Sequence, residues 1–325
     1  MTDTLITRRQ LLRTTSLLAG GTVVARVFPE SFATVFAQRG AAPADPVAAM
    51  RAQMAAAPIE RVGLTDNLTM LSGPGGNVIV LNGPDGKVVA DGFVLPAWVA
   101  LRKVLDSMGT QRITTMINTH WHYDHADNNA NFRQAGAEVI AHENTRKRLS
   151  ETHELAVLGM VFKPVPTNAL PTQIFAQDRK LQANGEGVEL GYIPPSHTDT
   201  DVYVRYTKAN VIHLGDTFFN GMYPYIDAGT GGSINGMIAA ADRSLKIVDA
   251  RTRIVPGHGP LADRAALTGF RDMMVAVRDR VQKLKSSGMP LDKTMAVKPT
   301  ASFDAEWGKG FLTPDQFVTI VYNTL

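Results

Sequence analysis

The sequence predicts a mixed α/β (α+β) fold, and three observations lead to that prediction. Short apolar runs rich in β-branched residues are separated by glycine- and proline-containing turns in the early part of the folded chain. Segments with helical periodicity then alternate with further short strands. The second half repeats the strand-rich pattern. A chain of 325 residues, 44% of them hydrophobic, is also long enough to bury a substantial core.

Residues 1–37 have the features of an export signal. Thr7-Arg8-Arg9-Gln10-Leu11-Leu12 is similar to the twin-arginine motif, and a short apolar stretch follows at Leu17–Phe28. That stretch is interrupted by Arg26 and is too short to predict a membrane-spanning helix. Val35-Phe36-Ala37 supplies a small-residue cleavage site. We therefore predict a partner in the twin-arginine export machinery, a periplasmic or secreted mature protein, and no integral membrane segment after signal removal. A disordered terminus with a chance arginine pair is the alternative.

Residues 38–60 are rich in Ala and Pro and predict a linker, or a loosely attached helix at Val47–Ala56. The folded domain is expected to begin near Arg61 and to occupy residues 61–325. Gly-Pro-Gly-Gly and Gly-Pro-Asp-Gly turns then separate three short apolar runs, which predicts successive antiparallel strands. These strands are expected at Asn67–Leu71, Asn77–Leu81 and Lys87–Asp91.

Alternating helices and strands are expected after these hairpins. A helix at Pro96–Met108 ends before Gly109 and is followed by a buried strand at Ile113–Ile117. The next elements are expected to be a helix at Asn131–Ala135, a strand at Glu138–Ala141 and a helix at Glu143–Ser150. Residues 151–173 contain three prolines and are expected to be irregular, either as a lid or substrate wall or as an ordered surface excursion.

The second half predicts a similar mixture of elements. Its strands are expected at Val188–Ile193, Val202–Tyr206, Val211–Leu214 and Arg253–Val255. Its helices are expected at Ile234–Val248, residues 261–285 and Pro314–Leu325. The two halves therefore each combine hairpin strands with αβ units.

Histidines and carboxylates cluster directly after the strand expected at Ile113–Ile117. Three of the eight histidines fall in the His-x-His-x-Asp-His pattern of residues 120–125. Imidazole and carboxylate are suitable ligands for Zn, Fe, Mn and similar divalent metals. A tight loop at a strand end can direct His120 and His122 to one point, and Asp124 and His125 to a neighbouring point. This layout predicts two metal ions a few ångströms apart.

These residues resemble the signature of the metallo-β-lactamase superfamily, and the resemblance covers roughly residues 65–325. It implies an αββα sandwich, with the metal site along the edge where strand ends meet. It also implies the remaining ligands in order along the chain: His197 after a Pro-Pro turn, Asp216 after Gly215, and His258 between two glycines. By this resemblance the first metal is held by His120, His122 and His197, the second by Asp124, His125 and His258, and Asp216 bridges them.

The resemblance implies a hydrolase with two zinc ions per chain, with Fe or Mn as alternatives. Zinc lowers the pKa of bound water to about 7, so hydroxide held between the ions is available to attack a small ester, thioester, lactone or lactam. Asp124 is the catalytic candidate, orienting the hydroxide and carrying a proton to the leaving group. Four aromatic residues are candidates for the substrate pocket, although ordinary packing also explains them: Trp121, Tyr123, Tyr223 and Tyr225.

Asp216 bears on the branch of the superfamily. The β-lactamase branches generally lack a bridging aspartate there, whereas hydroxyacylglutathione hydrolases, lactonases and phosphodiesterases have one. A class B3-like β-lactamase activity, as main or side activity, is kept as an alternative. Lactonases place a tyrosine shortly after this aspartate, and Thr217-Phe218-Phe219 departs from that pattern. The alternative from another enzyme class is an oxidoreductase of the sulfur dioxygenase type with one iron.

Composition narrows the remaining possibilities. The net charge is +3, and no basic stripe follows the export segment beyond Arg146-Lys147-Arg148, so a small molecule rather than nucleic acid is the expected partner. The chain has no Cys, which excludes a disulfide framework and a thiolate ligand. The histidines left over are His142 and His213, expected to be structural, and His153 in the irregular segment.

Overall fold

The computed structural model describes residues 45–325, so the predicted export signal and the first residues of the predicted linker lie outside the described part. The strands are β1 (Glu60–Gly63), β2 (Leu68–Ser72), β3 (Asn77–Leu81), β4 (Lys87–Ala90), β5 (Ile113–Ile117), β6 (Glu138–His142), β7 (His153–Leu155), β8 (Met160–Phe162), β9 (Gln173–Phe175), β10 (Arg179–Ala183), β11 (Glu186–Tyr192), β12 (Val202–Tyr206), β13 (Val211–His213) and β14 (Arg253–Val255).

The helices have these bounds: α3 (Pro46–Ala55), α4 (Trp98–Ser107), α5 (Tyr123–Ala126), α6 (Asn129–Gln134), α7 (Glu143–Leu149), α8 (Ile234–Ile247), α9 (Arg264–Ser286), α10 (Leu291–Ala296), α11 (Asp304–Trp307) and α12 (Pro314–Asn323). Short 3-10 turns are η1 (Leu95–Ala97), η2 (Ala156–Leu158), η3 (Thr167–Ala169), η4 (Gly215–Thr217) and η5 (Ala228–Thr230). Within residues 45–325, none of the helices combines the length and apolar character that a membrane crossing requires.

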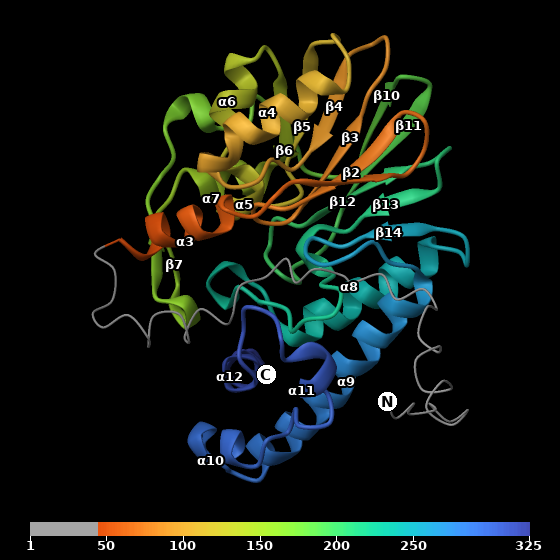
Figure 1. Cartoon of the computed structure of the whole chain (residues 1–325). Coiled ribbons are helices and arrows are strands. Elements are labelled where there is room, and N and C mark those ends of the chain that lie inside the picture. The colour runs from red at the N-terminus through yellow and green to blue at the C-terminus, as the bar shows by residue number, and fades with distance from the viewer. Residues whose placement is uncertain (1–44) are drawn as a thin grey trace, which may run out of the picture.

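Two mixed sheets form the centre of the molecule (Figure 1). The larger sheet has seven strands in the order β1-β2-β3-β4-β5-β6-β9, and the smaller has five in the order β10-β11-β12-β13-β14. In the larger sheet the pairs from β1 to β4 are antiparallel, and β4, β5, β6 and β9 run parallel. In the smaller sheet only the β13–β14 pair is parallel. Each sheet therefore combines a hairpin region with parallel strands, as the sequence predicts.

Strand β3 buries both faces because its alternate residues belong to two different cores. Ile79 and Leu81 of β3 lie in a core with Val204 of β12 and Val255 of β14, so this core is the contact between the sheets. Val80 of the same strand lies in the second core, which includes residues of the helices outside the sheets. This two-sided burial explains why β3 reads as a continuous apolar run rather than an alternating one.

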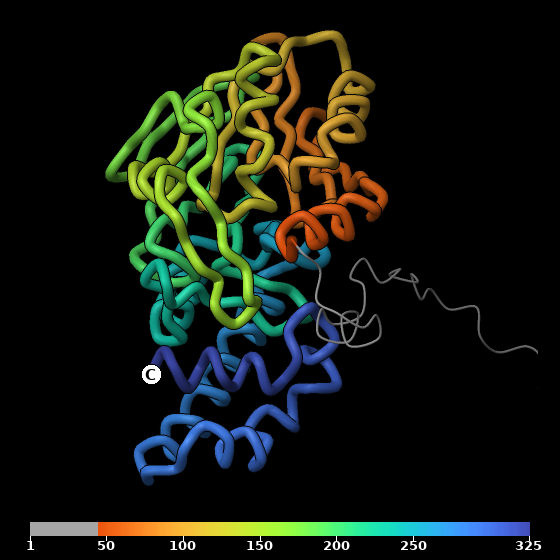
Figure 2. Tube along the Cα trace, turned by 90° about the vertical axis from the view of Figure 1, so that its left-hand side faces the viewer, coloured from red at the N-terminus to blue at the C-terminus, as the bar shows by residue number. Residues whose placement is uncertain are grey.

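Helices cover the outer face of each sheet, which completes the αββα order that the resemblance implies. Leu101 and Leu105 of α4 are fully buried in the outer core, as is Phe132 of α6. On the other side, α8 and α9 pack against each other below the smaller sheet, and α10, α11 and α12 extend from them (Figures 1 and 2). The predicted fold class is confirmed.

Residues 38–60 are predicted to be a linker or a loosely attached helix at Val47–Ala56, and the described residues of this region confirm the helix. Residues 46–55 form α3, whose N-terminus is capped by Asp45 through the amide of Ala48 at 2.9 Å. Val47 and Met50 are buried in the core, so α3 is part of the folded body rather than loosely attached. Its Pro and Ala content is that of a short helix with proline in its first turn.

Residues 151–173 also differ from the irregular segment that the prolines suggest. They form the β7–β8 hairpin, followed by η3 and the start of β9. The turn is closed by Gly159 at φ 64, a left-handed conformation that glycine adopts without strain. In Figure 2 this hairpin extends from the sheet region toward α12.

Candidate metal centre

All seven predicted ligands follow the carboxyl end of a strand. His120, His122, Asp124 and His125 follow β5, with the last two on the short helix α5. His197 lies in the loop between β11 and β12, Asp216 lies in η4 after β13, and His258 follows β14. Because these strand ends meet at one edge of the two sheets, residues as far apart as His120 and His258 become neighbours.

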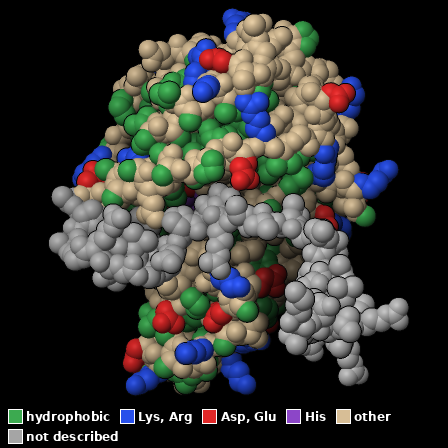
Figure 3. Space-filling view, in the orientation of Figure 1, with side chains coloured by type: hydrophobic (Ala, Val, Ile, Leu, Met, Phe, Trp, Pro, Cys, Tyr) green, Lys and Arg blue, Asp and Glu red, His purple; other side chains and the backbone are tan. Residues whose placement is uncertain are grey.

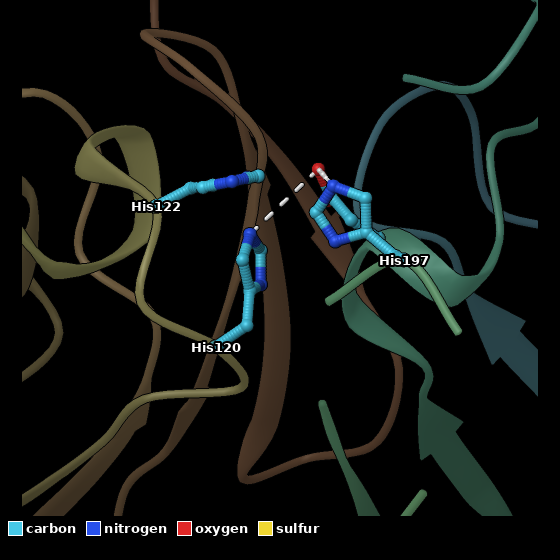
Figure 4. Close-up of side chains that lie close together, drawn as sticks. His120, His122 and His197 are labelled. Atoms are coloured by element: carbon cyan, nitrogen blue, oxygen red, sulfur yellow. Dashed lines mark ion pairs between the residues drawn. The ribbon is translucent and has the colours of Figure 1, made fainter. Parts of the chain in front are cut away.

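The seven side chains form two adjoining groups. In the first, ligand atoms of His120, His122, His197 and Asp216 all lie within 4.8 Å of one another, and the same holds for Asp124, His125 and His258 in the second. Figure 4 shows the three histidines of the first group, two from the loop after β5 and one from the facing loop, gathered around a small space.

Asp216 reaches both groups. Its Oδ2 lies 3.8 Å from Nε2 of His120 and 3.8 Å from Nε2 of His197, in the first group. Its two oxygens also lie 3.2 Å from Nε2 of His125 and 3.3 Å from Nε2 of His258, in the second group. One carboxylate therefore stands between two sets of imidazoles, which is the position that the resemblance implies for it.

The donor set fits a metal ion better than it fits a closed polar core. Nε2 of His120 and Nε2 of His197 are buried without a hydrogen-bond partner among the described residues, and Nε2 of His125 faces Oδ1 of Asp216 at 3.2 Å without good hydrogen-bond geometry. A buried polar atom without a partner is costly, so several of them facing one space point to a group that satisfies them together. Nitrogen and carboxylate oxygen donors suit zinc and similar divalent metals.

The ring nitrogens that face away from the centre have partners of their own. Nδ1 of His125 lies 2.8 Å from Oδ2 of Asp91, and Nε2 of His122 lies 3.1 Å from Oδ2 of Asp227. Nδ1 of His120 lies 3.0 Å from Oγ1 of Thr119. Contacts of this kind fix the orientation and tautomer of a ligating imidazole. They leave Nε2 of His125 and Nδ1 of His122 as the nitrogens available to a metal.

Asp91 and Asp227 are buried carboxylates that contact predicted ligands and that the sequence analysis does not single out. Asp91 follows β4 at φ 65 and also binds Thr119 and His213 at 2.8 and 3.0 Å. In the sequence, Asp91 is an acidic residue at the end of a buried strand, and it is predicted only as the last residue of that strand. Asp227 is followed by turn residues and has no signal near it in the sequence, because its partner His122 is 105 positions away.

The loop that carries His197 is held by a second buried carboxylate. Oδ2 of Asp201 accepts hydrogen bonds from Oγ of Ser196 at 2.7 Å and from the amides of His197 and Thr198 at 2.9 and 2.8 Å. Three bonds to one oxygen restrain the backbone on both sides of His197. The Pro-Pro turn before this loop therefore leads into a fixed ligand position rather than a mobile one.

Glycine is required where the backbone approaches Asp216. A β-carbon on Gly257 would collide with Oδ1 of Asp216, and one on Gly76 would lie 2.8 Å from Cε1 of His125. Gly259, at φ 101, adopts a conformation that other residues rarely take. The glycines on either side of His258 therefore permit the close approach expected from the sequence.

The protonation of the cluster follows from its mixture of charges. Burial disfavours the charged form of His258, but Asp216 and Asp124 outweigh it and raise its pKa to about 9. Burial likewise opposes the charged form of His125, but neighbouring carboxylates raise its pKa well above the usual value. For His120, burial and the nearby positive charge of His125 lower the pKa well below its usual value. His120 is therefore neutral, while His125 and His258 hold protons when no metal is bound.

Two of the predicted pocket residues line a cavity beside the loop that carries His122. Trp121 and Tyr123 line this cavity of about 390 Å³ with Arg51 of α3 and Phe162 of β8. Tyr123 stacks on Phe162 at 5.0 Å between ring centroids. The ring of Trp121 also lies 4.8 Å from that of His122, so Trp121 stands between this cavity and the first group.

The two other aromatic candidates differ from each other. Tyr223 donates a hydrogen bond to Asp304 at 2.8 Å and stacks on Phe317, so it belongs to the packing of the C-terminal helices. Tyr225 lies at the cluster, with its ring centroid 5.9 Å from that of His122 and 6.3 Å from that of His197. The prediction that Tyr223 lines the pocket is therefore not supported by its contacts, whereas Tyr225 is placed beside the first group.

The remaining histidines lie outside the two groups. His213 contacts the same oxygen of Asp91 as His125 does, and His142 stacks on Tyr192 at 4.1 Å, so both make the structural contacts that were predicted. His153 lies beside Trp121, with the ring centroids 4.9 Å apart.

A two-sheet sandwich with paired His and Asp groups at one edge defines a metal-binding αββα protein. The family profile of the metallo-beta-lactamase superfamily matches residues 71–258, more than half of the chain and all seven predicted ligands. The chain belongs to the metallo-β-lactamase superfamily.

Two curated relatives match part of the sequence. The chain is 27% identical over 164 residues to a hydroxyacylglutathione hydrolase of Polaromonas sp. (strain JS666), and these residues are 50% of this chain and 54% of that protein. It is 27% identical over 168 residues to a hydroxyacylglutathione hydrolase of Nitrosococcus oceani, with the same two coverages. The match thus spans about half the length of these relatives.

Solved structures show the same fold at low sequence identity. The metallo-beta-lactamase IND-7 superposes with a TM-score of 0.55 at 16% identity, over 67% of this chain and 98% of that one. A double mutant of the sec-alkyl sulfatase PisA1 gives a TM-score of 0.60 at 16% identity, over 88% of this chain and 53% of the sulfatase. These likenesses establish the fold.

Proposed function

We propose that this protein is a hydrolase that uses two metal ions, in the first instance zinc, to cleave a small ester, thioester, lactone or lactam. The observation that carries the proposal is the position of Asp216, which lies within 3.8 Å of imidazole nitrogens in both ligand groups. A carboxylate in that position suits a pair of cations rather than one. The superfamily and the coarse similarity to hydroxyacylglutathione hydrolases support hydrolysis as the reaction class.

The chain's own residues divide the work between holding, orienting and proton transfer. Divalent metals bound here would lower the pKa of a water molecule toward neutrality and polarise a carbonyl oxygen. The first would be held by His120, His122 and His197 and the second by Asp124, His125 and His258, with Asp216 shared. Asp91 and Asp227 orient the imidazoles of His125 and His122 through the contacts at 2.8 and 3.1 Å.

Asp124 is suited to move a proton. It is 6% exposed, and its Oδ2 lies 3.3 Å from Nε2 of His258 and 3.6 Å from Nε2 of His125. Burial raises its pKa, but the positive charge of His125 and the contact with His258 lower it below the usual value. Asp124 is therefore ionised at neutral pH, and it can accept a proton from water and deliver it to the leaving group.

The experiment that tests the proposal removes the first group and leaves the fold intact. His120→Ala with His122→Ala should reduce bound metal to about one equivalent or less and abolish hydrolysis of a panel of esters, thioesters, lactones and lactams. The matched control is His142→Ala, which removes a histidine outside the cluster and should change neither property. Full turnover in the double variant, with its metal lost, would contradict the proposal.

We also propose that the protein is exported by the twin-arginine route to the periplasm or beyond. The support is the Arg8-Arg9 pair, the short apolar stretch and the small-residue site in residues 1–37. Replacing Arg8 and Arg9 by Lys should leave the full-length precursor in the cytoplasmic fraction. Unchanged export of that variant would overturn this part of the proposal.

A further inference from the structure

The cluster is almost closed to solvent. His120, His125 and His197 are fully buried, and the other four side chains are slightly exposed: His122 and Asp216 at 4%, His258 at 5% and Asp124 at 6%. A substrate therefore reaches the cluster over these four side chains, of which Asp124 and His258 are the most exposed. The residues flanking this accessible side decide which substituents fit next to the reacting carbonyl.

An aromatic wall adjoins His258 on that side. Phe219 stacks on His258 with ring centroids 5.1 Å apart and ring planes 9° apart, and it is fully buried. The ring centroid of Phe311 lies 6.4 Å from those of both His258 and Phe219, and Phe311 is only partly buried. Of these two phenylalanines, Phe311 is thus the one whose side chain remains accessible to a ligand.

The backbone around Phe311 holds that ring in place. A β-carbon on Gly310 would lie 2.6 Å from Cβ of Met222, so the bend there is packed against the segment that also carries Phe219. Leu312 on the other side is 1% exposed. Thr313 then caps α12 in a reciprocal capping box with Gln316. A ring held this way loses little freedom on binding, which favours its use as a binding surface.

We propose that Phe311 is a specificity-determining residue that selects substrates carrying an aromatic or apolar group on the His258 side. This inference rests on the proposed function, because it places that group next to the bond that the metals attack. It directs the search toward aryl and alkyl esters, thioesters and lactones.

The test uses the zinc-loaded full chain and measures binding rather than turnover. Phenylacetate and acetate present the same carboxylate to the metals and differ by one aromatic ring. By calorimetry, phenylacetate should bind at least about tenfold more tightly than acetate, because the ring is removed from water and packs against Phe311. In Phe311→Ala this ratio should fall to about two or less.

Two further variants keep the test decisive. Phe303→Ala truncates another partly buried aromatic of the C-terminal region, one that packs under Arg280 at 5.1 Å, and should leave the ratio unchanged. Phe311→Leu should keep the fold and metal content and give a ratio between those of Phe311 and Ala. If phenylacetate and acetate bind alike, or if the ratio survives in both Phe311 variants, the inference is wrong.

Turnover then separates this inference from the proposed function. The p-nitrophenyl esters of phenylacetate and acetate release the same leaving group, so their kcat/KM ratio should follow the binding ratio and fall in Phe311→Ala. If the binding preference is present but no ester, thioester, lactone or lactam is cleaved, the proposed function fails and the role of Phe311 in binding stands. If the esters are cleaved but the phenylacetyl group is not preferred, the proposed function stands and the role of Phe311 fails.

Discussion

Asp227 is a buried side chain that contacts His122, a predicted metal ligand, on the ring nitrogen that faces away from the cluster. It is 1% exposed, it contacts Nε2 of His122, and it accepts a hydrogen bond from Oγ1 of Thr230 at 2.7 Å. Trp121 donates weakly to the same Thr230 at 3.4 Å, so the indole belongs to this network. A carboxylate so restrained holds the imidazole of His122 in one orientation.

Removing that charge should weaken the metal site without unfolding the protein. Asp227→Asn should lower affinity for metal at the first group by roughly 10- to 100-fold, measured by competition with a chromophoric chelator. Asp279→Asn removes an exposed carboxylate from α9 and serves as the control. Equal metal affinity in the Asp227 and Asp279 variants would show that Asp227 is not a positioning residue.

The protonation of His125 and His258 predicts opposite pH trends for metal binding and metal-free stability. Both pKa values are raised, that of His258 to about 9, so both rings carry protons at neutral pH without metal. Metal must displace these protons, so affinity should rise by roughly tenfold per pH unit for each proton released, up to about pH 9. Titrations at several pH values test this, and a pH-independent affinity would contradict it.

The stability of the metal-free protein is expected to change with pH in the opposite direction, falling as the pH rises. A histidine whose folded pKa is raised stabilises the metal-free fold below its unfolded pKa of about 6.5. That contribution disappears as the pH rises through the folded value, which for His258 is about 9. The metal-free protein should therefore melt at a lower temperature near pH 9 than near neutral pH, as calorimetry can measure. An unchanged or higher melting temperature would argue against protonated histidines in the cluster.

At the scale of elements, α3 acts as a brace for the metal-binding loop. Nε and Nη2 of Arg51 donate to the two oxygens of Asp127, both at 2.6 Å. Asp127 is the C-cap of α5, the helix that carries Asp124 and His125. Helix α3 is therefore joined to the second ligand group by a bidentate ion pair.

Arg51→Ala should destabilise the fold because it leaves the carboxylate of Asp127, 7% exposed, without its cation. We expect a loss of about 1.5–3 kcal/mol in urea unfolding, together with weaker binding of the second metal. Arg102→Ala breaks an exposed pair with Asp106 and should cost less than about 1 kcal/mol. Equal losses in the two variants would mean that α3 does not brace the loop.

The elements predictable from sequence are those with strong local patterns. The predicted bounds of Asn77–Leu81 and Ile113–Ile117 coincide with β3 and β5, because a buried apolar run between turn residues leaves few alternatives. Strand β10 is not predicted from the sequence. Its residues Arg179–Ala183 alternate between exposed and half-buried positions at a sheet edge. Its conformation depends on pairing with β11, which no local pattern encodes.

The candidate site likewise contains residues that can be predicted from the local sequence and residues that cannot. The seven predicted ligands are recognisable because metal coordination restricts residue type and spacing, and the structure brings all seven together. The carboxylates behind them, Asp91 and Asp227, and the wall residue Phe311 depend on contacts between distant segments. Trp121 and Tyr123 adjoin predicted ligands in the sequence, but only the structure shows that they line the cavity beside Arg51 and Phe162.

At the scale of the whole molecule, the two-sheet sandwich brings the predicted ligands together, and the C-terminal region adds side chains beside His258. The face in Figure 3 carries Lys and Arg interspersed with Asp and Glu, rather than a continuous basic surface. The C-terminal region from α10 onward lies beyond the residues that the family profile matches. This region supplies Phe311, so we expect substrate choice to depend on a part of the chain outside the shared core.

The most direct test is the metal content of the purified full-length protein, measured by elemental analysis after dialysis against metal-free buffer. If two ligand groups share Asp216, the protein should retain about two divalent metal ions per chain, and Asp216→Ala should retain about one or fewer. A folded wild-type protein that holds no metal after exposure to zinc, iron or manganese would contradict the account.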